Sequence, residues 1–182
     1  MEFKDYFQSK KHELLELWIN KFWEEFGESA YYFKREIDPF TNPFGYHIRV
    51  CFEKVFDSLC GDVNWGEIEE ALQKLAQIRA VQESLPSKAS KMFLILKGII
   101  RDRIGDEILN KFGISYLLSL EDRINIFMLR YFDFYQTYRE RLYELKVEEF
   151  KRNNYLLLKR AGLIDESSEF TLKDESNQYK KH

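Results

Sequence analysis

The segment Gln77-Ile-Arg-Ala-Val-Gln-Glu-Ser-Leu-Pro-Ser-Lys88 closes one predicted helix and opens the next. In the helix before it, which we expect to begin near Trp65, apolar residues recur at the helical spacing, and Arg79 falls in the middle of their arc. A guanidinium that points into a helical core must meet a carboxylate, a set of carbonyls or a bound anion, because an unpaired buried charge is prohibitive. The pattern therefore predicts either a structural ion pair or a polar pocket inside a helical bundle.

Helical periodicity continues on both sides of this segment. Only three prolines and eight glycines interrupt the 182 residues, and no alternating segment bounded by hairpin turns indicates a strand. We therefore predict an all-α bundle of about five main helices with a long C-terminal helix. The expected helices cover residues 3–27, 43–60, 65 to the segment quoted above, 86–112 and 120–160.

Local rules mark two of the expected helix starts. Asn42 stands at the N-cap of the helix over residues 43–60, and Pro43 occupies its first position, where the missing N–H costs nothing. Ser119, with Asp122 at the capping spacing, indicates the start of the last helix near residue 120.

The last helix carries apolar and aromatic residues at steps of four and three, the spacing of a helix seam. The seam consists of Ile124, Met128, Tyr131, Tyr135, Tyr138, Leu142 and Leu145. We expect its first half to pack within the monomer, whereas Tyr135, Tyr138, Leu142 and Leu145 are the candidate dimer or output interface. The helical domain is expected to cover residues 1–164, and the polar residues 165–182 are expected to form a disordered tail.

Bulk composition limits the classes of function. The hydrophobic fraction of 45% and the aromatic fraction of 16% are sufficient for one well-filled core. A net charge of −3 lacks the basic footprint of nucleic-acid binding. The chain has neither a long apolar run nor a signal-peptide pattern, so we expect a cytoplasmic protein that does not bind a membrane. Cys51 and Cys60 fall on opposite faces of one predicted helix, which predicts neither a disulfide nor a shared metal site.

Three blocks of sequence carry a resemblance to a known family. The first is Asp38-Pro-Phe-Thr-Asn-Pro-Phe-Gly-Tyr-His-Ile48. The second is Ile78-Arg-Ala-Val-Gln82, followed by Pro86-Ser87 and by Phe93 to Lys97. The third is Tyr138-Arg-Glu-Arg-Leu-Tyr-Glu144, followed by Lys151-Arg152 and by Leu156 to Ile164. Over about residues 1–164 they resemble the N-terminal domain of RsbR/RsbRD-type RsbT co-antagonists, the sensory modules of bacterial stressosome-like regulators.

The resemblance implies a non-haem, globin-like helical fold that dimerises and passes a signal through its last helix. The partner that we expect is a signalling protein, such as a kinase, a phosphatase or a scaffold. Nothing after Ile164 resembles the STAS phosphoacceptor domain of the full-length regulators. We therefore expect a stand-alone version of the sensory half.

A polar constellation around the quoted segment is the candidate ligand site. Asn42, with Pro43 and Gly45 after it, presents a helix N-terminus with an accessible backbone, which favours an anion. Arg79 would add a fixed cation. The site could hold a small anionic ligand, or the same groups could tie two helix ends together, with Arg79 capping carbonyls or pairing with Asp38. Its members are Asn42, Gly45, Tyr46, His47, Arg79, Gln82 and Ser87.

Cofactor binding and catalysis have little support in the sequence. Among the histidines His12, His47 and His182, His47 is the one candidate for haem ligation, and its place in the first turn of a helix is more typical of a solvent-edge residue. No residues have metal-ligand spacing or match a catalytic motif. We therefore predict a non-enzymatic regulatory or sensory domain without a cofactor. The alternatives are a haem- or gas-binding globin-type sensor and a ligand-free structural adaptor.

Overall fold

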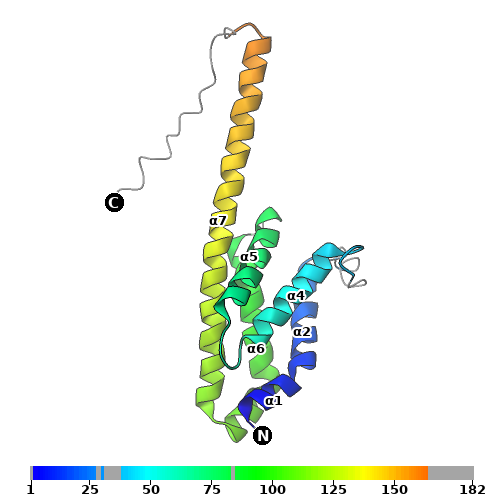
Figure 1. The fold of residues 1–182 in the computed structure, drawn as a ribbon, viewed down its shortest axis with the longest axis vertical. Coiled ribbons are helices and arrows are strands. Elements are labelled where there is room, and N and C mark those ends of the chain that lie inside the picture. The colour runs from blue at the N-terminus through cyan, green and yellow to red at the C-terminus, as the bar shows by residue number, and fades with distance from the viewer. Residues whose placement is uncertain (1, 28–29, 31–37, 83–84, 164–182) are drawn as a thin grey trace, which may run out of the picture. The chain divides into compact units, whose positions relative to one another are not determined.

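The computed structural model describes residues 2–27, 30, 38–82 and 85–163, most of which are helical (Figure 1). Residues 1–140 form one compact unit and residues 141–182 a second. No strand occurs in the described residues, so the predicted all-α class is confirmed. The tail predicted over residues 165–182 lies outside the described residues. The described helices are α1 (Phe3–Ser9), α2 (Lys11–Glu24), α4 (Pro43–Asp57), α5 (Trp65–Val81), α6 (Pro86–Lys111) and α7 (Ile114–Arg160).

Two helix boundaries differ from the sequence-based expectation. The first predicted helix is broken at Lys10, where the N–H bonds to Phe7 O at 3.1 Å, and neither glycine nor proline marks this break. The last helix begins at Ile114 rather than near residue 120, because Gly113 takes a φ of 94° and ends α6 in a single residue. Ser119 therefore lies inside α7 and does not cap it.

The core of the first unit forms where α2 packs against α4 and α6 (Figure 1). Trp18 is fully buried there, and its ring stacks on Phe52 with centroids 3.9 Å apart. Its indole Nε1 donates to Met92 O at 2.8 Å, which satisfies the polar atom of the largest buried side chain. Phe7 of α1 extends this core by stacking on Phe56 of α4 at 4.8 Å.

The first half of α7 packs within its own unit, as the seam predicted. Ile124, Tyr131 and Tyr135 are buried. Trp65 was expected on the buried face of α5 but is 42% exposed. Its ring lies edge-on to Phe127 of α7, with centroids 6.1 Å apart, so it closes the side of the core rather than entering it.

In the second unit, α7 continues to Arg160 and most of its described side chains are exposed. Apolar residues are among them, including Leu145, Val147 and Phe150. No helix in the described part of the chain has the length and apolarity that a membrane crossing requires.

A buried carboxylate joins α6 to α7 in the first unit. Glu121 is 8% exposed and accepts from Arg101, whose Nη2 lies 2.6 Å from Oε2. Lys97 Nζ lies 3.5 Å from the same oxygen. The hydrogen bond from Arg101, with the nearby charges of both cations, lowers the pKa of Glu121 below its ordinary value, although burial opposes this.

Acid should weaken this contact between α6 and α7. A carboxylate with a lowered pKa in the folded state stabilises the fold above its unfolded pKa, and this stabilisation is lost as the pH falls through the folded pKa. We expect the free energy of unfolding of wild type to fall by about 1 kcal/mol more than that of Glu121→Gln between neutral pH and about pH 3. Urea unfolding at several pH values measures this difference. Asp122→Asn, at the exposed neighbouring position, is the control for the loss of one carboxylate. If the free energy of unfolding depended on pH in the same way in wild type and in Glu121→Gln, the expectation would be contradicted.

Candidate functional site

Arg79 lies in the last turn of α5, and its residue is only 4% exposed, as its wheel position predicted. Its Nη2 donates to Glu25 Oε2 at 3.1 Å, and its Nη1 donates to Gln82 Oε1 at 3.2 Å. The guanidinium carbon lies 5.5 Å from the ring centre of Phe22 and 5.3 Å from that of Phe26. Aromatic faces attract a cation, so the ion pair and the rings together stabilise the buried charge.

Glu25 caps the end of α2 and connects Arg79 to a third helix. Its side chain is 22% exposed, and Lys91 of α6 lies 3.7 Å from its Oε1. Arg79 Nη2 also reaches Lys88 O, 3.5 Å away in the first turn of α6. Arg79 therefore joins the ends of α2 and α5 to the start of α6. The carboxylate is Glu25 rather than Asp38, whose Oδ2 accepts from Thr41 N at 2.9 Å.

Two buried polar atoms near this pair have no hydrogen-bond partner in the described part of the chain, Arg79 Nε and Tyr131 Oη. Burial raises the pKa of Tyr131 well above its ordinary value, and the charge of Arg79 opposes that rise. Arg139 of α7 also donates to Ala80 O at 3.2 Å. The last turn of α5 therefore touches α7 as well. We call Glu25, Arg79, Gln82 and Tyr131 the Arg79 network.

The other members of the predicted constellation are divided among separate places. Asn42 caps α4 as predicted, since its Oδ1 accepts from Gly45 N at 2.8 Å. Tyr46 is half-buried in the same turn, and Ser87 is exposed in the first turn of α6. Phe26 brings the start of α4 toward Arg79, because its ring centre lies 6.3 Å from that of Phe44.

His47 lines a cleft of about 340 Å³ between α4, α5 and the part of α7 that contains Tyr138. Most of its lining side chains are polar, including Lys54, Glu70 and Lys74. In the described ranges, no group of three His, Cys, Asp or Glu residues could hold a metal ion. Cys51 also lines this cleft, and burial raises its pKa to about 11.

The four candidate dimer or output residues differ in how far they are exposed. Tyr135 is fully buried within its own chain, and its role in a dimer or output interface stays a prediction. Tyr138 is half-buried and lines the His47 cleft. Leu142 is half-buried and Leu145 is 53% exposed, and their role as an interface stays a prediction.

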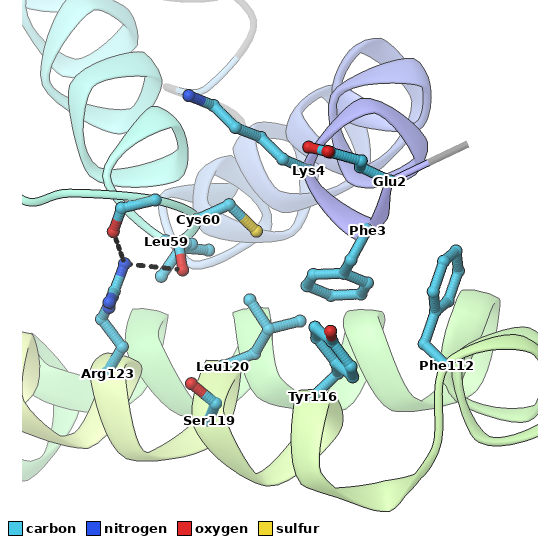
Figure 2. Close-up of a pocket in the computed structure, with 11 residues that line it drawn as sticks. Glu2, Phe3, Lys4, Leu59, Cys60, Phe112, Tyr116, Ser119, Leu120 and Arg123 are labelled. Atoms are coloured by element: carbon cyan, nitrogen blue, oxygen red, sulfur yellow. Dashed lines mark hydrogen bonds between the residues drawn. The ribbon is translucent and has the colours of Figure 1, made fainter.

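A larger cleft, of about 560 Å³, lies at the start of α7, and sequence reasoning missed it (Figure 2). We call it the α7 cleft. The start of α1, the chain after α4, the end of α6 and the first turns of α7 form its walls. Four distant segments contribute to it, so no local motif marks it. Its lining residues are Glu2, Phe3, Lys4, Leu59, Cys60, Gly61, Phe112, Tyr116, Ser119, Leu120 and Arg123.

The α7 cleft has an aromatic end and a cationic end (Figure 2). The ring centres of Phe3 and Tyr116 are 4.6 Å apart, and those of Phe3 and Phe112 are 5.2 Å apart. At the other end, Arg123 Nη1 donates to Gly61 O at 2.6 Å and to Leu59 O at 3.2 Å. These bonds fix the guanidinium at the end of α4, where the helix dipole favours a cation.

Comparison with known proteins identifies the family. Residues 12–149 match the family described as RsbT co-antagonist protein rsbRD N-terminal domain. Neither the comparison with curated proteins nor that with solved structures found a match. The family match covers more than half of the 182 residues and takes in the whole Arg79 network. The chain therefore belongs to the RsbRD N-terminal domain family, a family of regulatory sensor domains in stress signalling.

Proposed function

We propose that this chain is a non-enzymatic regulatory domain in which the Arg79 network links the state of the core to α7. A ligand or a protein partner would act at or near the network, and α7 would carry the change to a signalling protein. That protein would be a kinase, a phosphatase or a scaffold. The family description makes an RsbT-type protein the first partner to test.

The observation that carries this proposal is the position of Arg79. One side chain touches the ends of α2 and α5 and the start of α6, and its charge acts to lower the pKa of Tyr131 in α7. An anion or a partner carboxylate that competes with Glu25 for the guanidinium would release α2 from α5. Because Tyr131 is fully buried and the charge of Arg79 acts on it, a change in Arg79 would alter how α7 packs.

The output surface that we propose is the part of α7 after residue 140. Leu145, Val147 and Phe150 are all more than half exposed there. Apolar side chains on a helix that also carries Arg152 and Glu149 suit a protein partner with both apolar and charged groups. The same stretch is our candidate for homodimerisation.

The proposal is tested by measuring how an RsbT-type protein from the same organism binds three chains: wild type, Arg79→Met and Lys74→Gln. Lys74 lines the His47 cleft and lies outside the network, so its variant is a matched loss of one positive charge. We expect Arg79→Met to change the dissociation constant about tenfold, the usual size of an allosteric coupling, and Lys74→Gln to leave it unchanged. Isothermal titration calorimetry measures both. Absent binding, or equal binding by all three chains, contradicts the proposal.

A further inference from the structure

The α7 cleft has the size and the lining of a small-molecule site. Its volume of about 560 Å³ lies within the range of pockets that enclose small ligands. Apolar side chains, including Leu59, Leu120 and Phe112, and polar side chains line it in similar measure. Tyr116 is 44% exposed, so its ring is accessible at the aromatic end. A ligand with a planar apolar body could pack against these rings with edge and face contacts.

Two cations of the cleft are not paired with a carboxylate. Among the described residues, neither Lys4 nor Arg123 forms a salt bridge. The hydrogen bonds of Arg123 within the described ranges all leave from Nη1, so its Nη2 and Nε remain available. Burial raises the pKa of Cys60 to about 11, while Arg123 and Lys4 both act to lower it. Lys4 Nζ also comes close to Gly61, whose carbonyl accepts from Arg123, so both positive charges lie at the same wall of the cleft.

The charge of the cleft limits the charge of its ligand. Glu2 lines the cleft together with the two cations, which leaves a net charge of one positive unit (two cations, one carboxylate). A single carboxylate matches this balance, whereas a second negative group would be repelled by Glu2. Ser119 adds a hydroxyl on the α7 side, which can donate to a carboxylate oxygen.

We propose that the α7 cleft binds a small aromatic monocarboxylate. Its ring would lie against Phe3, Phe112 and Tyr116, and its carboxylate would accept from Arg123, with Lys4 adding attraction. Residues 2–4 precede the part of the chain that matches the family, so this site goes beyond what the family assignment covers. It also goes beyond the function proposed above and does not depend on it. A ligand here would contact the first turns of α7 directly.

The test uses the full chain of 182 residues and 1-naphthoate as the probe, with binding measured by calorimetry and by saturation-transfer NMR. We expect a dissociation constant of about 0.1–1 mM, in keeping with the size of the probe. The neutral 1-naphthamide should bind about tenfold more weakly, since it lacks the charge-assisted hydrogen bond. Octanoate should also bind more weakly, since it cannot make ring contacts.

Variants of the cleft separate this site from any other. Lys4 is on the surface, and Lys4→Gln should weaken naphthoate binding several-fold. Ser119→Tyr should abolish naphthoate binding, because the larger side chain fills the cleft. Arg123→Gln should weaken binding about tenfold, with thermal unfolding as a check because Arg123 also holds the end of α4. Lys74→Gln, in the other cleft, should bind as wild type does.

Each alternative outcome overturns the proposal. Equal binding of naphthoate and its amide removes the role of the carboxylate. Equal or tighter binding of octanoate removes the aromatic class. A naphthoate affinity that neither Lys4→Gln nor Ser119→Tyr changes, or one that is lost in Lys74→Gln, places the ligand elsewhere. No binding by wild type also overturns it, and none of these results bears on the partner measurement with Arg79→Met.

Discussion

Replacing Glu25 by alanine is expected to lower the free energy of unfolding by about 3 kcal/mol, because it leaves the buried cation Arg79 without its carboxylate. The reverse change, Arg79→Met, should cost only about 1 kcal/mol. Glu25 is 22% exposed and keeps Lys91 at 3.7 Å, whereas the side chain of Arg79 is 5% exposed. Methionine also fills much of the space beside Phe22 and Phe26. Urea unfolding of both single variants measures this asymmetry.

The double variant provides the decisive comparison for this ion pair. Removing both charges leaves no buried charge of this pair without its partner, so Glu25→Ala combined with Arg79→Met should be more stable than Glu25→Ala alone. Glu24→Ala is the matched control, since Glu24 is exposed and pairs with Lys21 on the surface. We expect it to change stability by less than about 0.5 kcal/mol. A double variant that is less stable than Glu25→Ala contradicts the ion pair as the reason for the cost.

The second large effect is expected at Trp18. Trp18→Ala should lower the free energy of unfolding by about 4 kcal/mol, because it opens a cavity where α2, α4 and α6 meet and removes the stack on Phe52. It also leaves Met92 O without the indole donor that lies 2.8 Å away. Chemical unfolding followed by circular dichroism measures this cost.

Phe40→Ala is the control for this variant. Phe40 is an aromatic residue that is 92% exposed, and its loss should change stability by no more than about 0.5 kcal/mol. If Trp18→Ala were as stable as Phe40→Ala, the junction of the three helices would not depend on Trp18 and the described core would be wrong.

The sequence alone could predict features that depend on neighbouring residues. The helical period places Arg79 on the buried face of α5, and the capping rule places Asn42 at the start of α4. Both depend on spacings of a few residues. The carboxylate partner could not be predicted in this way, because Glu25 lies 54 residues from Arg79 and the helical period contains no information about which helices pack together.

Features that depend on several helices could not be predicted for the same reason. Heptad spacing marks Tyr135 as a contact residue but does not say whether the contact is within the chain, and the structure buries Tyr135 in its own unit. The α7 cleft combines the start of α1 with Arg123 of α7, and no pattern in either segment points to the other. Lys4 and Arg123 have no salt-bridge partner within the ranges that the structure describes, and their shared place in the cleft becomes visible only when the helices are assembled.

The central claim is that the Arg79 network carries changes in the core to α7, and amide hydrogen exchange in Arg79→Met tests it most directly. This variant should remain close to wild type in stability, so its exchange pattern reports local packing rather than global unfolding. We expect amides of α7 around Tyr131 to Arg139 to exchange about tenfold faster than in wild type, together with those at the ends of α2 and α5. Faster exchange confined to α2 and α5, with α7 unchanged, would contradict the claim.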